Sequence, residues 1–156
     1  MVRVCFVCLG NICRSPTGEG VMKKVIADAA LSSAIGTDSA GTAAYHVGDR
    51  PDARSQRHAA RRGVTLPGRS RQFQKSDFTK FDYVLAMDEE NLRNLSKLGG
   101  KQEHLSLLLD YADALPVGSS VPDPYYGGDA GFEEVLDLCQ QGCEGLLAAI
   151  RREHSL

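Results

Sequence analysis

The chain has 156 residues, which suits one compact domain, and we expect residues 1–156 to form a single domain. Its 18 basic and 20 acidic side chains give a formal net charge of −2. The chain therefore lacks the excess of basic residues that is typical of nucleic-acid-binding proteins. No segment has the length and apolarity of a membrane span, and no secretory signal is recognisable at the start. We therefore expect a cytoplasmic protein.

The five cysteines are odd in number and unevenly spaced, which predicts reduced thiols rather than a disulfide framework. None of the histidines stands at a metal-ligand spacing from these cysteines, so no metal site is expected.

Signals for strands and helices alternate along the first half of the chain. The apolar, β-branched run from Val2 to Val7 predicts a buried strand, and Ser15-Pro16 is typical of an N-cap and first helical position. A weaker strand is expected near 37–41, a helix over 52–62, and a second buried strand over 83–87.

The second half continues the same alternation. Asp88 is a plausible N-cap for a helix that stops at Gly99-Gly100, and a last strand is expected over 104–109. A loop rich in Pro, Gly and Ser over 117–128 precedes a long amphipathic helix over 129–152, with Cys139 and Cys143 on its apolar face. Alternating strands and helices predict a small doubly wound α/β sheet, whose ligand loops open at the carboxyl ends of the strands.

The loop after the first strand carries the main chemical signal. It runs from Cys8 to Ser15 between a buried strand and a helix N-terminus, where unpaired backbone N–H groups and the helix dipole can hold a tetrahedral dianion. The same positive environment favours the thiolate of Cys8, a nucleophile, and Arg14 offers a planar fork for two phosphate oxygens. Gly10 permits a tight turn, and the Ser15 hydroxyl can donate a hydrogen bond to the Cys8 sulfur. The alternative is a buried apolar Cys8 with a surface charge at Arg14.

Asp123 is a candidate proton donor for a leaving group. It stands between two prolines, and Tyr125 and Tyr126 follow it as flat apolar surfaces that can stack on an aromatic substrate and desolvate the carboxyl. The residues alone leave open a turn aspartate beside two packing tyrosines.

Several segments resemble the low molecular weight protein tyrosine phosphatases in the order of that family. They cover most of the chain and are Val7 to Pro16, Asp38 to Thr42, Pro51 to Arg54, Phe81 to Asp88, and Asp123 to Gly127. The resemblance implies a four-stranded parallel doubly wound sheet with helices on both faces, the flavodoxin-like arrangement of this family.

The resemblance also implies roles for named residues. Cys8 would be the nucleophile that forms a phosphocysteine, Arg14 the phosphate binder, and Asp123 the general acid and then the base. The phosphate loop would comprise Leu9, Gly10, Asn11, Ile12, Cys13, Arg14 and Ser15. The cleft walls would comprise Leu9, Ile12, Tyr45, His46, Tyr125 and Tyr126. Cys13 matches a second thiol that can trap oxidised Cys8 as a disulfide.

The implied substrates are phosphotyrosine-containing proteins, with inorganic phosphate as product and no cofactor. A monomer is expected. In this family Asn11 is held by serines, here Ser15 and Ser39, and by a histidine. No histidine occurs near Gly68-Arg69, where Arg69 or a water would have to replace it.

Three other functions are weighed against this one. An arsenate reductase of related fold needs relay cysteines on a mobile segment, but no cysteine occurs from Ala27 to Leu138. A protein arginine phosphatase tends to carry threonine where this chain has Ile12. A phosphotyrosine-binding module without turnover would leave Cys8 and Asp123 unexplained.

A local cluster of arginines has two interpretations: a solvated helix face, or a basic rim that attracts an anionic or acidic partner. Its members are Arg50, Arg54, Arg57, Arg61, Arg62, Arg69 and Arg71.

Overall fold

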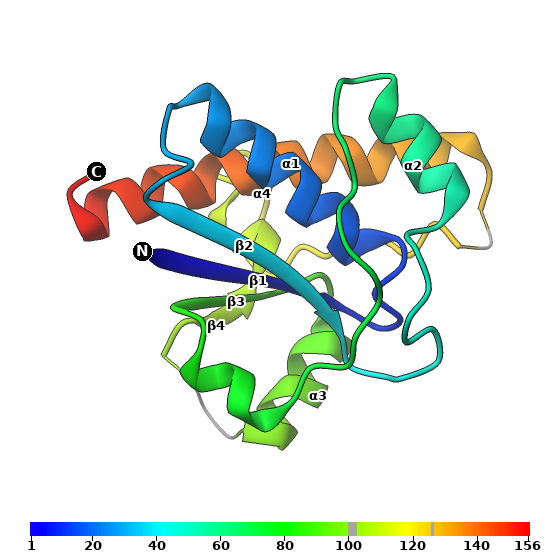
Figure 1. The fold of residues 1–156 in the computed structure, drawn as a ribbon, viewed down its shortest axis with the longest axis horizontal. Helices are drawn as coiled ribbons and strands as arrows, with labels where there is room; N and C mark the ends of the chain where they lie inside the picture. Colours follow the sequence, from blue (N-terminus) through cyan, green and yellow to red (C-terminus); the bar gives the residue numbers. More distant parts are fainter. Residues whose placement is uncertain (100–102, 126) are drawn as a thin grey trace.

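The computed structural model describes residues 1–99, 103–125 and 127–156. Its centre is a sheet of four parallel strands in the order β2-β1-β3-β4 (Figure 1). The strands are β1 (Val2–Cys8), β2 (Ile35–Gly41), β3 (Tyr83–Ala86) and β4 (Leu105–Leu107). Because all four run the same way, the loops that follow Cys8, Gly41 and Ala86 meet at one edge of the sheet. The predicted doubly wound α/β fold is confirmed.

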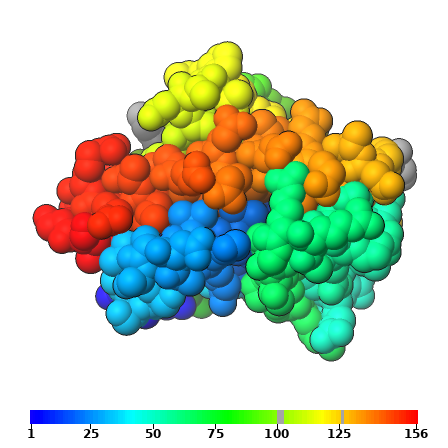
Figure 2. Space-filling view, turned by 90° about the horizontal axis from the view of Figure 1, so that it is seen from above, coloured from blue at the N-terminus to red at the C-terminus, as the bar shows by residue number. Residues whose placement is uncertain are grey.

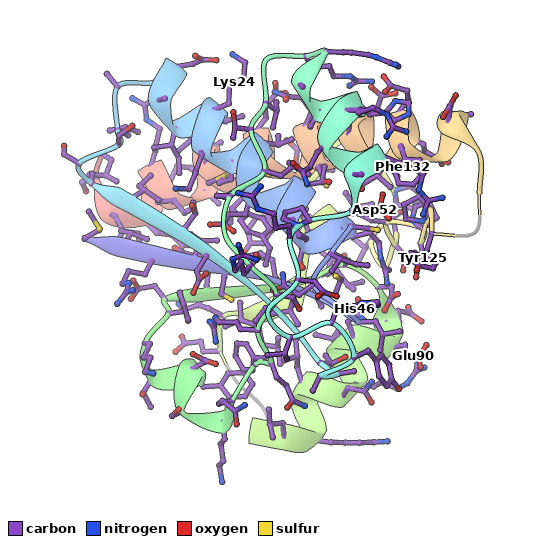
Figure 3. The ribbon with its side chains drawn as sticks, turned by 45° about the vertical axis from the view of Figure 1, so that its right-hand side comes forward. Lys24, His46, Asp52, Glu90, Tyr125 and Phe132 are labelled. Carbon is purple, nitrogen blue, oxygen red and sulfur yellow. The ribbon has the colours of Figure 1, made fainter. Side chains whose placement is uncertain are left out.

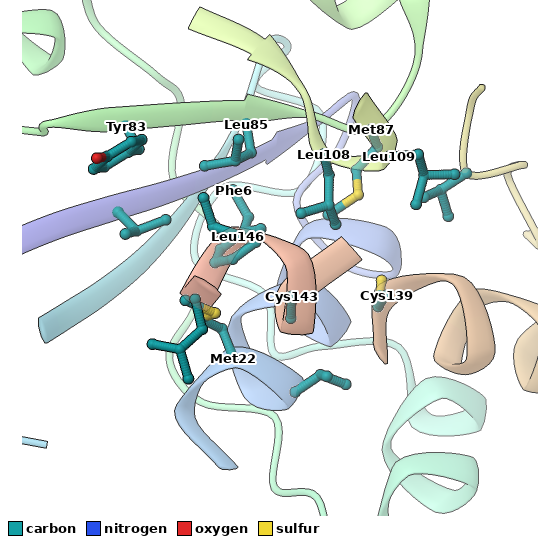
Figure 4. Close-up of a cluster of buried hydrophobic side chains, with 14 of the residues drawn as sticks. Phe6, Met22, Tyr83, Leu85, Met87, Leu108, Leu109, Cys139, Cys143 and Leu146 are labelled. Carbon is teal, nitrogen blue, oxygen red and sulfur yellow. The ribbon is translucent and has the colours of Figure 1, made fainter. Parts of the chain in front are cut away.

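One face of the sheet is covered by α1 (Arg14–Asp28) and α4 (Asp129–His154), with α2 (Ala53–Ala60) packed on α4. In Figure 2, α4 runs along this face with α1 and α2 on one side of it. Val4, Phe6 and Cys8 of β1 point into this core, because side chains alternate along a strand. Figure 4 shows Phe6 beside Met22 of α1 and Leu146 of α4.

The opposite face is covered by α3 (Glu89–Gly99) and the short 3₁₀ segment η1 (Lys75–Thr79) (Figure 1). Cys5 and Val7 of β1 point this way and pack with Leu95 of α3 in a second, smaller core. Burial on both faces explains why β1 and β3 read as continuous apolar runs. Asp88 caps α3 as predicted, since its Oδ1 accepts the Asn91 N–H at 2.7 Å. Gly100, the second half of the expected stop, lies outside the described residues.

The predicted start of α1 at Ser15 was wrong by two positions. The N-cap is Cys13, which makes no side-chain capping bond, and the helix begins at Arg14. Ser15 lies inside the first turn, where its hydroxyl bonds residues of the preceding loop rather than the helix end. Pro16 is tolerated there because the first turn has no intrahelical acceptor for an N–H in any case.

Two further boundaries differ from the predictions. The strand expected over 104–109 ends at Leu107, and the chain turns into η2 (Leu108–Tyr111). That turn places Leu108 against α4, where a Cβ on Gly142 would lie 2.7 Å from it. The helix expected over 52–62 covers Ala53–Ala60, and Asp52 is its N-cap.

Cys139 and Cys143 are fully buried in the core between α4, α1 and the sheet, as the apolar stripe of the last helix predicted (Figure 4). None of the helices in the described ranges is long and apolar enough to cross a membrane.

Candidate active site

The loop between β1 and α1 places Cys8 directly against the first turn of the helix. The Cys8 Sγ lies 3.0 Å from the Ser15 Oγ, and the Ser15 backbone N–H donates to the same sulfur at 3.4 Å. Both residues are almost fully buried. The sulfur is therefore fixed where the N-terminal N–H groups of α1 and the helix dipole act on it.

Asn11 organises this loop from beneath. It is a non-glycine residue in the left-handed conformation (φ 57°), which is strained unless its surroundings hold it. Its Nδ2 donates to Ser15 Oγ at 2.8 Å and to Ser39 Oγ at 3.0 Å. The expected turn residue, Gly10, has no positive φ; a side chain there would instead meet the ring of His46, 2.9 Å from an added Cβ.

A backbone group takes the place expected for a histidine or for Arg69. The Arg71 N–H donates to Asn11 Oδ1 at 3.0 Å, and the Ser70 hydroxyl donates to the Gly10 carbonyl at 2.9 Å. The Arg69 guanidinium points elsewhere, to the Gly48 carbonyl at 3.0 Å, so the suggested replacement by Arg69 is wrong.

Side-chain ion pairs fix the segment that contains Ser70 and Arg71. Arg71 pairs with Asp38 at 3.0 Å and with Asp77 at 3.0 Å, and Asp77 is 4% exposed. The segment around Arg71 is thus tied to β2 and η1 while its backbone reaches the phosphate loop.

Glu19 extends the polar network below the loop, and sequence reasoning missed it. The Ser39 hydroxyl donates to Glu19 Oε1 at 2.9 Å. Burial raises the pKa of Glu19, although the hydrogen bond from Ser39 opposes that shift. The available signal was its place four residues after Ser15, on the same face of α1.

Arg14 lies at the inner wall of the site, with its side chain 4% exposed. Its Nη1 donates to Asp88 Oδ2 at 2.6 Å and to the Val121 carbonyl at 3.1 Å. Burial alone would lower the pKa of Arg14, but the nearby Cys8, Asp88 and Asp123 outweigh it, so the guanidinium stays charged. Asp88 was predicted only as a helix cap; its place after β3, beside β1, was the signal for a second role.

Asp123 comes to the same site from the loop before α4. Its Oδ2 lies 3.7 Å from Arg14 Nη2, and its Oδ1 accepts the Tyr125 N–H at 3.0 Å. The side chain of Asp123 is 47% exposed. Tyr125 therefore does not shield the carboxyl from solvent as we expected. Tyr126 lies outside the described residues.

Cys8, Arg14 and Asp123 line one cavity of about 280 Å³, which brings the predicted nucleophile, phosphate binder and proton donor together. Tyr45 is largely exposed at its mouth, and the rings of His46 and Tyr125 lie 6.4 Å apart. The lining residues are Cys8, Leu9, Gly10, Ile12, Cys13, Arg14, Tyr45, His46, Asp123 and Tyr125. Asn11, Ser15 and Ser39 lie behind this surface.

The second thiol of the loop, Cys13, differs from Cys8 in its surroundings. Burial, followed by the charge of Asp52, raises the pKa of Cys13 to about 12. At neutral pH Cys13 is therefore a thiol, and a neutral thiol is a poor nucleophile.

The arginine cluster is partly neutralised within the fold. Arg54 pairs with Asp52, Arg62 with Glu133 and Asp137, and Arg71 with Asp38 and Asp77. These pairs weaken the hypothesis of a continuous basic rim.

The fold and the arrangement of the site are compared with those of known families. The family model described as low molecular weight phosphotyrosine protein phosphatase matches residues 3–156. The chain therefore belongs to that family, and it is an enzyme of the protein-tyrosine-phosphatase type.

Two relatives agree with this assignment, and a third shares the fold but is named for another substrate. The low molecular weight protein-tyrosine-phosphatase YfkJ of Bacillus subtilis is 42% identical over 159 residues, covering 100% of both chains. A solved protein tyrosine phosphatase from Entamoeba histolytica has a TM-score of 0.93 at 40% identity and also covers 100% of both chains. A solved Drosophila arginine phosphatase has a TM-score of 0.84 at 30% identity, covering 95% of this chain and 97% of its own.

Proposed function

We propose that this protein hydrolyses phosphotyrosine monoesters in proteins through a phosphocysteine on Cys8. The observation that carries the proposal is the Cys8 sulfur, held at the helix N-terminus 3.0 Å from the Ser15 hydroxyl, in one cavity with Arg14 and Asp123. A helix N-terminus is suited to a phosphate dianion and to a thiolate alike. The proposed steps use protein side chains and water, with no cofactor.

In the first step the Cys8 thiolate attacks phosphorus. A sulfur–phosphorus bond forms, the bond from phosphorus to the phenolic oxygen breaks, and Asp123 gives its proton to that oxygen. Arg14 and the N–H groups of residues 9 to 15 bind the equatorial oxygens, where charge spreads in the transition state. The position of Asp123 in the same cavity as Cys8 and Arg14 supports this assignment of the acid.

In the second step water attacks the phosphocysteine. Asp123, now ionised, takes a proton from the water, the sulfur–phosphorus bond breaks, and inorganic phosphate leaves. The sulfur departs as a thiolate, which the Ser15 hydroxyl stabilises by donating a hydrogen bond.

The cleft favours an aromatic phosphate ester. Leu9, Ile12, Tyr45 and Tyr125 contribute apolar or aromatic surface, which suits a phenyl ring better than the short side chain of phosphoserine. Ile12 offers no hydroxyl for the guanidinium of phosphoarginine, although a Drosophila arginine phosphatase shares the fold. We assign the substrates to phosphotyrosine proteins of the cytoplasm and expect residues 1–156 to act as one monomeric domain.

Two rival functions fit the structure less well. An arsenate reductase would need relay thiols that can reach Cys8, whereas Cys139 and Cys143 are fully buried within α4. A binding module without turnover would have no use for a proton donor beside Arg14.

The test compares Cys8→Ser with Cys13→Ser, the same change at two thiols of one loop. We expect Cys8→Ser to lower hydrolysis of an aryl phosphate about 10⁴-fold or more while phosphate binding survives, because only the nucleophile is lost. Cys13→Ser should keep most of the activity, and iodoacetamide at neutral pH should alkylate Cys8 in preference to Cys13. If both variants are equally active, or if alkylation selects Cys13, the proposal is wrong.

A further inference from the structure

Arg54, in the first turn of α2, lies against two aromatic rings of other elements. Its guanidinium carbon is 5.4 Å from the centre of the Tyr125 ring and 4.8 Å from that of Phe132. Tyr125 lines the substrate cavity, whereas Phe132 belongs to the first turns of α4. Figure 3 shows Asp52, Tyr125 and Phe132 gathered on the same side of the molecule. Distances of this size allow cation–π attraction.

The guanidinium is held in one orientation by Asp52. Arg54 Nε donates to Asp52 Oδ1 at 3.2 Å and Nη2 donates to Oδ2 at 3.1 Å, a two-pronged contact. The backbone N–H of Asp52 in turn donates to the Ile12 carbonyl at 2.8 Å. A continuous chain of contacts thus leads from the phosphate loop through Asp52 and Arg54 to the ring of Tyr125.

The ring of Phe132, the second aromatic partner of Arg54, is itself held in place by neighbouring side chains. Phe132 is buried and stacks on His58 of α2, with ring centres 5.5 Å apart and planes 8° apart. His58 is also buried and hydrogen-bonds Glu133 and Asp129 of α4. Arg54 therefore couples the exposed Tyr125 to a rigid junction between α2 and α4.

We propose that Arg54 is a positioning residue that fixes the Tyr125 wall of the cleft and so sets the preference for aromatic phosphates. The inference rests on the proposed function, since it assumes that the substrate ring lies against Tyr125. Arg54 does not line the cavity and is not assigned a contact with phosphate. Its loss should weaken binding of the ring and leave binding of the phosphate group unchanged.

Arginine suits this position better than lysine. Its planar guanidinium can make the two-pronged bond to Asp52 and lie on an aromatic face at once, whereas an ammonium cannot do both. Arg54→Lys should therefore lose part of the effect even though the charge is kept.

The experiment uses two ligands that differ by one ring, inorganic phosphate and phenylphosphonate. Their dissociation constants are measured by calorimetry for the unmodified protein, Arg54→Met, Arg54→Lys and the control Arg62→Met. Arg62 is a fair control because it too is paired with carboxylates, Glu133 and Asp137 of α4, and neither of these partners lines the cavity. Calorimetry reports binding without turnover, so a failure of the proposed hydrolysis is recognised separately.

We expect Arg54→Met to weaken phenylphosphonate binding about three- to five-fold, the size of a partly exposed cation–π contact, with phosphate binding unchanged. Arg54→Lys should lie between Arg54→Met and the unmodified protein, and Arg62→Met should match the latter. The proposal is overturned if Arg54→Met weakens both ligands equally, if it weakens neither, or if Arg62→Met shows the same selective loss. Should Arg54→Met fail to fold, Arg54→Lys gives the same two-ligand comparison.

Discussion

The two halves of the site are built differently. The phosphate loop is buried and cross-linked by polar groups: Asn11 is 2% exposed, and its side chain bonds Ser15, Ser39 and the Arg71 backbone. The loop that carries Asp123 is far more open, with that side chain 47% exposed. It is tied to the core at Val121, whose N–H donates to the Met87 carbonyl at 2.8 Å and whose own carbonyl accepts from Arg14.

The difference agrees with the roles that we propose for the two halves. Backbone donors stabilise a transition state only if they are already oriented, so the phosphate loop has to be rigid before substrate binds. A proton donor at the mouth has to admit a substrate and release phosphate, which requires access from solvent. The structure accordingly places its buried polar bonds under Cys8 and leaves Asp123 to a few anchoring contacts.

Arg14 joins the two halves, and its replacement should have the largest effect after that of Cys8. Arg14→Lys keeps the positive charge but loses the planar fork, which reaches Asp88 and is proposed to bind two phosphate oxygens. We expect kcat/KM for an aryl phosphate to fall about 10³-fold. Steady-state kinetics measure the effect, with Arg69→Lys as control, since Arg69 contacts the Gly48 carbonyl outside the cavity. Equal activity of both variants would show that Arg14 does not bind the transition state.

Asn11→Ala breaks the rigidity of the phosphate loop alone. It removes the side-chain bonds that hold a left-handed backbone and frees the Ser15 hydroxyl to reorient away from Cys8. We expect kcat to fall about 10- to 100-fold, because the donors are no longer preorganised. The paired variant Ser39→Ala removes one of these bonds and should lose less. If Ser39→Ala is the more damaging change, the loop does not depend on Asn11 in the way described.

Asp52 should give the smallest effect, and it is measured on stability. Burial tends to raise the pKa of Asp52, but hydrogen bonds from Arg54 and Ser55 outweigh it, so the pKa lies below its usual range. A lowered folded-state pKa adds stability that is complete above the unfolded value of about 3.9 and is lost as pH falls below it.

The measurement is urea unfolding of the unmodified protein and of Asp52→Asn, which can still cap α2 but carries no charge. Near neutral pH we expect the variant to be less stable by about 1 kcal/mol. The difference should shrink as the pH falls below about 4. A difference that stays constant with pH would contradict the assigned pKa shift.

Much of this arrangement could be predicted from the sequence, and the exceptions have physical reasons. Apolar runs and periodic stripes predicted β1, β3 and α4, because buried positions of strands and helices carry apolar side chains. The start of α1 was misplaced because Ser15 serves Cys8 and Asn11 instead of capping a helix. The group that bonds Asn11 in place of the expected histidine could not be predicted. It is the backbone N–H of Arg71, and every residue except proline has such a group.

The contact of Asp88 with Arg14 and that of Glu19 with Ser39 were also missed. Asp88 caps α3 and binds Arg14, and Glu19 supports Ser39 from the buried side of α1. Their contacts join residues far apart in the chain, so their positions indicated a role but not the partner.

The most direct test of the central claim is a search for the phosphocysteine in Asp123→Ala. An aryl phosphate with a good leaving group needs little help from the acid in the first step, whereas the second step still needs the base. We expect a burst of about one phenol per chain, then slow turnover, and mass spectrometry of the quenched protein should find the phosphoryl group on Cys8. Hydrolysis without a burst at the unmodified rate, or a phosphoryl group on any other residue, would contradict the account.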